Sequence, residues 1–315
     1  IMTVRLLMKV RVDKISTLSP DIKEIQFIPA DREFFPDCAA GSNIIFRMKK
    51  GLSRQYSLCN HRDPRRYRIA VKLDPSGRGG SQFAHEHVRE NEHYFISYPQ
   101  PDFSLSSLFS EYIFIAGGIG ITPILSFVYE LADKDKKMTL HYCVRHQREA
   151  IFLDELSRLP VNVILHCSED GERLDINKLL NVRTRDTALY YCGSVRFNQS
   201  VSGACSHWPL GTTYSENFSA PPAQGNIMGD PFIAEIPRSG HTLQVTADKT
   251  LLQVLLDDGV DIDYACEAGT CRSCIIDIIS GEIQHKDHCL TEEERKTLMT
   301  PCVSRGKGII VINSL

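Results

Sequence analysis

Four cysteines near the end of the chain constrain it more than any other feature of the sequence. Cys266, Cys271 and Cys274 have the spacing C-x4-C-x2-C, and Cys302 follows far downstream. This is the ligand spacing of a plant-type [2Fe–2S] cluster, in which each iron takes two thiolates from the protein. Zinc is the alternative, but zinc sites prefer paired C-x2-C units and this segment has only one. We therefore predict that these four cysteines are cluster ligands.

The composition excludes several classes of protein. The chain has eleven cysteines, an odd number without a secretion signal, which favours reduced thiols and metal ligands over a disulfide framework. A net charge of -3 gives no basic surface for nucleic acid or for an anionic membrane. No segment reaches the roughly 18 apolar residues of a membrane span. We expect a cytoplasmic protein that binds neither nucleic acid nor membrane.

The length of the chain and the changing spacing of its apolar residues indicate three domains. Residues 1–103 contain short apolar runs broken by proline, glycine and aspartate, which predicts an antiparallel β-barrel or sandwich. Its expected strands are Glu24 to Ile28, Asn43 to Met48, Tyr67 to Leu73 and His93 to Ser97. Residues 104–220 alternate strand and helix, which predicts a parallel sheet covered by helices. Its expected elements are strands Tyr112 to Ala116, Met138 to Val144, Val161 to Cys167 and Ala188 to Cys192, and a helix from Thr122 to Ala132.

A segment rich in proline and glycine, residues 221–230, predicts a linker before the third domain. Residues 231–315 indicate a small α+β unit. Its expected elements are a hairpin of Phe232 to Pro237 with Thr242 to Thr246, a helix from Thr250 to Leu256 and a closing strand from Gly308 to Ile312. Thr291 and Glu294 form a capping-box sequence, so we expect a short helix before Cys302.

Two segments of the first domain have residues that suit a flavin. Arg54, Tyr56 and Ser57 offer a cation for a phosphate, an aromatic wall and a hydroxyl near the ring. The alternative for such residues on a strand is an ordinary surface group. Downstream, a glycine-rich turn ending at Ser81 precedes a helical segment, where free N–H groups and the helix dipole favour a phosphate.

Two further segments suit a nicotinamide. Residues 117–123, GGIGITP, directly follow an expected strand and open an expected helix. Such a turn brings the backbone close to a dinucleotide, although it is not the GxGxxG fingerprint and the alternative is a purely structural turn. Cys192 ends another expected strand, where the alternative is an ordinary buried thiol.

Together these motifs resemble those of the phthalate dioxygenase reductase family. EAGTCRSC and TPCVSR are similar to its C-terminal plant-type ferredoxin domain, and RxYS, the GGS turn and YYCGS are similar to its flavin and nicotinamide motifs. The resemblance covers almost the whole chain. It implies a flavin-binding β-barrel, an NAD-binding α/β domain and a β-grasp ferredoxin domain, in that order. The sequence departs from the family at Arg272, where glycine is usual, and at Ser194, where proline is usual.

The resemblance also implies roles for individual residues. It assigns catalytic positions to Ser57, Thr122 and Cys192, with the Cys192 thiol beside the nicotinamide. Glu216 is expected to approach the same site, and Phe218 to cover the flavin ring. The expected cofactor-binding residues are Arg54, Tyr56, Ser57, Leu58, Val71, Lys72, Gly79, Gly80, Ser81, Gly117, Gly118, Gly120, Thr122, Pro123, Cys192, Gly193, Glu216 and Phe218.

The implied function is a reductase of an oxygenase system. It takes hydride from NADH onto FMN and passes single electrons through the [2Fe–2S] cluster to a Rieske-type oxygenase. FMN is expected over FAD because a helix start placed for a terminal phosphate needs no adenosine extension. Arg145 and Arg148 would suit the 2′-phosphate of NADPH, but similar residues occur in NADH-dependent members, so we expect NADH. The alternatives are a reductase for another acceptor, such as a cytochrome, and a non-enzymatic redox sensor.

Overall fold

The computed structural model describes residues 7–60, 63–218, 229–260 and 262–313. Its strands form three sheets, and packing divides the chain into two compact units. Among the described residues, one unit comprises those up to Phe46 and from Tyr56 to Phe218, and the other comprises Arg47–Gln55 and those after Phe218. Most of the predicted linker, residues 221–230, lies outside the described residues, and the division into three domains stays a prediction.

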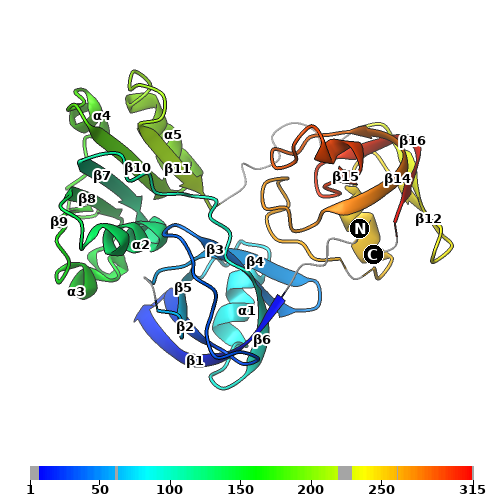
Figure 1. The fold of residues 1–315 in the computed structure, drawn as a ribbon, viewed down its shortest axis with the longest axis horizontal. Coiled ribbons are helices and arrows are strands. Elements are labelled where there is room, and N and C mark those ends of the chain that lie inside the picture. Colours follow the sequence, from blue (N-terminus) through cyan, green and yellow to red (C-terminus); the bar gives the residue numbers. More distant parts are fainter. Residues whose placement is uncertain (1–6, 61–62, 219–228, 261, 314–315) are drawn as a thin grey trace. The chain divides into compact units, whose positions relative to one another are not determined.

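The first sheet has the strand order β4-β3-β6-β1-β2-β5, and β1 runs antiparallel to both β2 and β6. Its strands are β1 (Leu7–Ser19), β2 (Ile22–Pro29), β3 (Asn43–Lys49), β4 (Leu52–Ser57), β5 (Tyr67–Lys72) and β6 (His93–Ser97), with helix α1 (Gly80–Glu86) between the last two (Figure 1). The four predicted strands correspond to β2, β3, β5 and β6. The antiparallel, barrel-like class is confirmed, but the expected strands do not include the long strand β1 or the short strand β4.

The second sheet is parallel, with the order β11-β10-β7-β8-β9. Its strands are β7 (Glu111–Gly117), β8 (Lys137–Val144), β9 (Asn162–Cys167), β10 (Thr187–Gly193) and β11 (Thr213–Asn217). Its helices are α2 (Ile121–Leu131), α3 (Leu153–Leu156), α4 (Ile176–Leu180) and α5 (Val195–Ala204), with single 3-10 turns η1 (Gly118–Gly120) and η2 (Gln147–Glu149). On β10, Tyr190 packs against Phe127 of α2, whereas Tyr191 belongs to the cluster of Trp208 and α5. Helices therefore cover both faces, as predicted.

These two sheets share one hydrophobic core. Ile22 and Ala70 from the first sheet belong to the same buried cluster as Phe114 and Phe127 from the second sheet and its helix. Phe103, between the two sheets in sequence, joins that cluster. The shared core explains why the second sheet and most of the first fall in one compact unit.

The third sheet has the order β13-β12-β16-β14-β15, with β12 and β16 parallel, and the pairs β12–β13, β14–β15 and β14–β16 antiparallel. Its elements are β12 (Phe232–Ile236), β13 (His241–Val245), α6 (Leu251–Asp257), β14 (Ile276–Gln284), β15 (Leu298–Met299) and β16 (Arg305–Ile312). Thr250 caps α6, and its side chain and that of Gln253 form a capping box. Leu251 and Leu255 of α6 pack beneath the sheet. The α+β class is confirmed.

The helix expected from the Thr291 capping box is a single 3-10 turn, η3 (Glu294–Lys296). The box itself forms, since the Thr291 N–H donates to the Glu294 carboxylate and the Glu294 N–H donates to the Thr291 hydroxyl. The turn stops because the chain enters β15 at Leu298, where it pairs with β14. The prediction was right about the cap and wrong about the length. In the described parts of the chain, no helix is long and apolar enough to cross a membrane.

A pair of histidines makes the stability of the second sheet depend on pH. His141 of β8 and His166 of β9 lie with Nδ1 and Nε2 3.0 Å apart. Burial, and to a smaller extent the neighbouring His166, lowers the pKa of His141 from 6.5 to about 4. The unfolded chain therefore binds more protons between these values, and stability is lost as pH falls through that window.

We expect the unfolding free energy to fall by about 1–3 kcal/mol between pH 6.5 and pH 4. His141→Phe should remove most of this dependence, whereas His87→Phe, which replaces an exposed histidine, should not. Urea unfolding followed by the fluorescence of Trp208, the single tryptophan, measures it. If the unfolding free energy depended equally on pH in wild type and in His141→Phe, this account would be contradicted.

Candidate functional site

Strand β11 places Glu216 beside two predicted catalytic residues. Glu216 is the register partner of Cys192 on β10, and the Ser57 hydroxyl donates to its Oε2 across 3.1 Å. Burial raises the pKa of Glu216 to about 7, the Ser57 hydrogen bond opposes this, and Asp102 adds to it. Burial also raises the pKa of the Cys192 thiol, so that thiol is neutral. The site combines a neutral thiol with a carboxyl group that titrates near neutral pH.

The predicted nicotinamide turn packs directly on the end of β10. A Cβ at Gly120 would lie 2.0 Å from the Cys192 carbonyl oxygen, so only glycine fits there. Gly117 and Gly193 both face the Phe197 ring, at 3.0 Å and 2.5 Å from an added Cβ. The GGIGITP and CGS segments therefore pack against each other, and this packing is an independent reason for glycine at positions 117, 120 and 193.

The other residues of this turn are also placed by the structure. Thr122 is buried at the start of α2, and its hydroxyl donates to the Ile119 carbonyl across 3.0 Å. Pro123 is buried in the first turn of that helix. Gly118 has a positive φ of 54° and open space where a Cβ would stand. Gly118 therefore exposes bare backbone, while the Thr122 hydroxyl is engaged within its own turn.

The predicted flavin residues lie on β4, β5 and the start of α1. Ser57, Leu58 and Val71 are buried, and Arg54 and Tyr56 are half-buried. Lys72 pairs with Asp21 and Glu149, and the Ser81 hydroxyl accepts from the Asp74 N–H. Gly79 precedes α1 with a positive φ of 77° and open space in place of a side chain, and Gly80 begins the helix. The Phe218 side chain, just after β11, is 41% exposed and free to cover a ring. Their cofactor roles stay predictions.

The four cluster cysteines form two pairs. A hydrogen bond from Cys271 lowers the pKa of the Cys266 thiol, and Cys274 donates to Cys302. Backbone N–H groups also point at sulfur, from Ala268 to Cys266 across 3.3 Å and from Cys266 to Cys271 across 3.4 Å. Two thiol pairs with backbone donors suit two irons, each of which takes two thiolates. The residues present therefore fit a [2Fe–2S] cluster.

The backbone of the cluster loop is tightly folded. Glu267, Gly269 and Arg272 all have positive φ, at 55°, 67° and 60°. A Cβ at Gly269 would lie 2.6 Å from Val303 and 2.9 Å from the Asp287 Cα, so this position requires glycine. These turns direct backbone N–H groups inward at the sulfurs.

The sequence analysis did not identify several residues that hold these sites together. The buried Ser273 hydroxyl lies 3.1 Å from the Cys271 sulfur. The buried Asn198 side chain donates to the Glu216 carbonyl and to the Asn217 side chain, which anchors the end of β11. Ser194, where the family has proline, caps α5 by accepting from the Phe197 N–H. Only Ser194 had a sequence signal, since serine is a preferred N-cap residue.

Comparison with known proteins agrees with this geometry. Residues 114–203 match the model of an oxidoreductase NAD-binding domain, and residues 234–306 match that of a 2Fe-2S iron-sulfur cluster binding domain. The chain is 35% identical to a vanillate O-demethylase oxidoreductase of Acinetobacter baylyi, over 98% of this chain and 99% of that protein. It is also 35% identical to the heme-dependent oxidative N-demethylase beta subunit of Ectopseudomonas mendocina, over 98% and 99%.

The same relationship holds for the fold. The solved structure of phthalate dioxygenase reductase, described as a modular structure for electron transfer from pyridine nucleotides to [2Fe-2S], superposes with a TM-score of 0.73 at 31% identity. The match covers 98% of each chain. The chain therefore belongs to the phthalate dioxygenase reductase family, as an oxidoreductase with an NAD-binding domain and a 2Fe-2S cluster-binding domain.

Proposed function

We propose that this protein is the NADH-dependent reductase component of an oxygenase system and that its electron acceptor is a Rieske-type oxygenase. The observation that carries the proposal is the presence in one chain of two thiol pairs and of a glycine turn packed on Cys192. Full-length relatives that serve oxygenases support it. A plant-type cluster at roughly -400 mV also lies below the range of Rieske centres, so electrons would flow downhill.

FMN supplies the chemistry that joins a two-electron donor to a one-electron acceptor. The chain's own residues position the groups around the site of hydride transfer. Burial keeps a proton on the Glu216 carboxyl group up to about neutral pH, the Ser57 hydroxyl orients that group by donating to Oε2, and the neutral Cys192 thiol offers a small apolar neighbour. Gly118, with open space where a Cβ would stand, brings bare backbone close to the dinucleotide. We propose that Ser57, Thr122 and Cys192 line the point of hydride transfer.

Charges at the end of β8 support NADH as the donor. Arg145 and Arg148 are exposed there, but His146 between them binds the Glu169 carboxylate and lies near that of Glu149. These carboxylates oppose the 2′-phosphate of NADPH. The ratio of kcat/KM for the two nucleotides tests this, and a preference for NADPH would contradict it.

The proposed function is tested by anaerobic titration with NADH. Flavin and iron–sulfur absorption should both bleach, and mass spectrometry of the released flavin should give FMN. A spectrum that NADH leaves unchanged would refute the proposal. The reduced protein is then mixed with a purified Rieske oxygenase and, in parallel, with a ferric haem oxygenase, which the heme-dependent relative makes the second candidate acceptor. Faster reduction of the haem protein would replace the Rieske assignment.

Titration of Glu216 should shape the pH profile of flavin reduction. We expect an apparent pKa near 7 in the wild-type rate that is missing from Glu216→Gln. Because the Ser57 hydrogen bond lowers the pKa of Glu216, Ser57→Ala should move the transition to higher pH. Stopped-flow absorption from pH 5.5 to about 9 measures both. A transition that persists in Glu216→Gln would assign it to another group.

A further inference from the structure

Arg272 adopts a backbone conformation that its side chain disfavours. It lies between the ligands Cys271 and Cys274 with a φ of 60°, in the left-handed region. Glycine adopts this conformation freely, whereas a residue with a Cβ is strained there. Strain of this kind persists only where the surroundings hold the residue in place.

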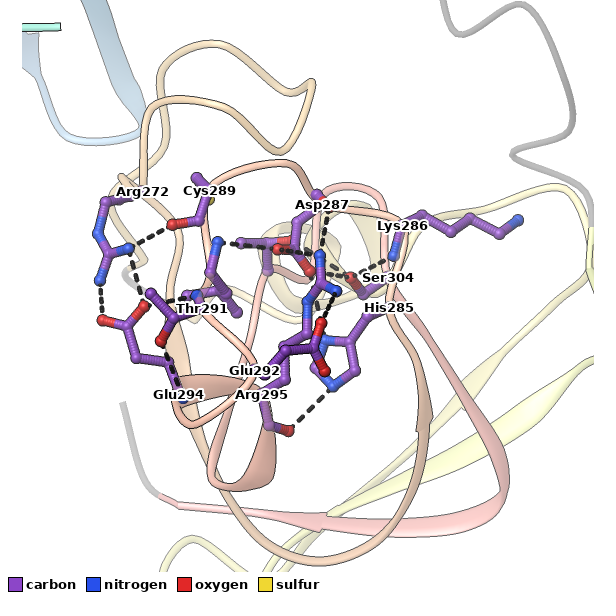
Figure 2. A network of polar contacts seen from close by, with 12 residues as sticks. Arg272, His285, Lys286, Asp287, Cys289, Thr291, Glu292, Glu294, Arg295 and Ser304 are labelled. Carbon is purple, nitrogen blue, oxygen red and sulfur yellow. Dashed lines mark hydrogen bonds and ion pairs between the residues drawn. The ribbon is translucent and has the colours of Figure 1, made fainter.

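The Arg272 guanidinium is held by a partner outside the cluster loop. Nη2 binds one oxygen of the Glu294 carboxylate and Nη1 binds the other across 3.1 Å, while Nη1 also donates to the Cys289 carbonyl (Figure 2). Two parallel bonds to one carboxylate match the planar fork of arginine, which lysine does not reproduce. Glu294 is itself oriented, because its carboxylate accepts from the Thr291 N–H across 2.9 Å.

The segment that contains this partner is anchored a second time, next to Gly269. The His288 N–H donates to the Gly269 carbonyl across 3.0 Å. The side chain of Asp287 is fully buried and bonds the Leu290 N–H, Arg295 and His285 (Figure 2). Gly269 and Arg272 lie on either side of Cys271, so the segment grips the loop at two points around a cluster ligand.

We propose that Arg272 is a positioning residue for the [2Fe–2S] cluster. Its two parallel bonds to the Glu294 carboxylate, the Arg272–Glu294 clamp, retain the cluster, and that carboxylate balances the positive charge of Arg272 beside the cluster. The proposal rests on the proposed function in that it requires the cluster. The clamp closes the loop over Cys271 and compensates in this chain for the strain that glycine avoids in the family. Glu294 also neutralises the guanidinium. Without it, the bare cation favours the reduced cluster, which carries one more negative charge.

A double-mutant cycle with a matched control tests the clamp. Glu294→Gln removes the charge and keeps an oxygen for Thr291, and Glu293→Gln makes the same change at the neighbouring residue, whose carboxylate pairs with exposed Lys296. Cluster loss is followed by visible absorption in excess chelator. We expect Glu294→Gln to lose its cluster about tenfold faster than wild type. Glu293→Gln should match wild type, and in an Arg272→Gly background Glu294→Gln should add no more than Glu293→Gln.

The potential of the cluster provides a second readout. Spectroelectrochemical titration should give Glu294→Gln a higher midpoint potential than wild type and Arg272→Gly a lower one than Glu294→Gln. Arg272→Lys keeps the cation and loses the two parallel bonds to Glu294. It should lose the cluster faster than wild type, without the lower midpoint potential expected of Arg272→Gly. Equal cluster loss in Glu294→Gln and Glu293→Gln would overturn the clamp. So would an effect of Glu294→Gln that persists undiminished in Arg272→Gly, since it would then act through Thr291. A wild-type protein without iron and sulfide would refute the proposed function itself and, with it, the clamp.

Discussion

Replacing Cys302 by alanine is expected to abolish electron transfer from NADH to cytochrome c, while NADH continues to reduce the flavin. Cys302 is buried and forms one of the two thiol pairs with Cys274, so its loss leaves one iron with a single protein ligand. The predicted flavin and nicotinamide residues after Gln55 belong to the other compact unit and keep their own core. We expect the rate of cytochrome c reduction to fall by at least about 100-fold.

The measurement separates the two halves of the reaction. Stopped-flow bleaching of the flavin should stay close to the wild-type rate, and the steady-state reduction of cytochrome c should be lost. Cys302→Ser repeats the test without leaving a cavity in the core. Cys289→Ala is the matched control, because Cys289 is half-buried in the same region and contributes only its carbonyl to Arg272. Cytochrome c reduction that survives in both Cys302 variants would show that electrons bypass the cluster.

The iron–sulfur domain could be predicted because the spacing of its cysteines is a local property of the sequence. The fold class followed from local patterns as well, and most expected strands lie within a few residues of those observed. Strand β1 is the main omission. Its apolar and charged residues alternate clearly only from Met8 to Val12, and the rest of the strand is set by pairing with β2 and β6.

Long-range contacts explain the rest of what the sequence did not show. Ser57 and Glu216 are 159 residues apart, and no spacing rule joins them. Gly120 suggested a dinucleotide-binding turn, but its close packing against the Cys192 carbonyl requires glycine just as strictly. The sequence also marked Arg272 as unusual and Glu294 as a helix cap without linking them, since their contact depends on the folded loop.

The second large effect is expected at Arg68, which joins the first sheet to the second. Arg68 on β5 binds Glu24 on β2 at 2.7 Å and both oxygens of Glu155 on α3 at 2.8 and 2.9 Å. Its guanidinium also lies 5.6 Å from the centre of the Phe152 ring. Arg68→Ala leaves two largely buried carboxylates without their cation, which should cost about 3–5 kcal/mol of unfolding free energy.

The expected loss depends on pH. Burial raises the pKa of Glu155, but the hydrogen bonds from Arg68 and Tyr129 outweigh it and leave that pKa below its ordinary value. Stability from a lowered carboxyl pKa is present above the unfolded value and is lost as pH falls. The difference between wild type and Arg68→Ala should therefore be largest at neutral pH and should shrink in acid. Urea unfolding followed by Trp208 fluorescence measures it, since Trp208 is buried in the same compact unit.

Two comparisons distinguish an unpaired buried charge from the mere loss of a long side chain. Arg66→Ala removes an arginine whose side chain is 41% exposed and pairs with Asp13, and should cost less than about 1 kcal/mol. Adding Glu24→Gln and Glu155→Gln to Arg68→Met replaces the ions by neutral groups of similar size. Because a buried ion pair often contributes little beyond the cost of desolvating its members, this triple variant should recover most of the lost stability. If it stayed as unstable as Arg68→Ala, the packing of the Arg68 side chain, and not its charge, would hold the two sheets together.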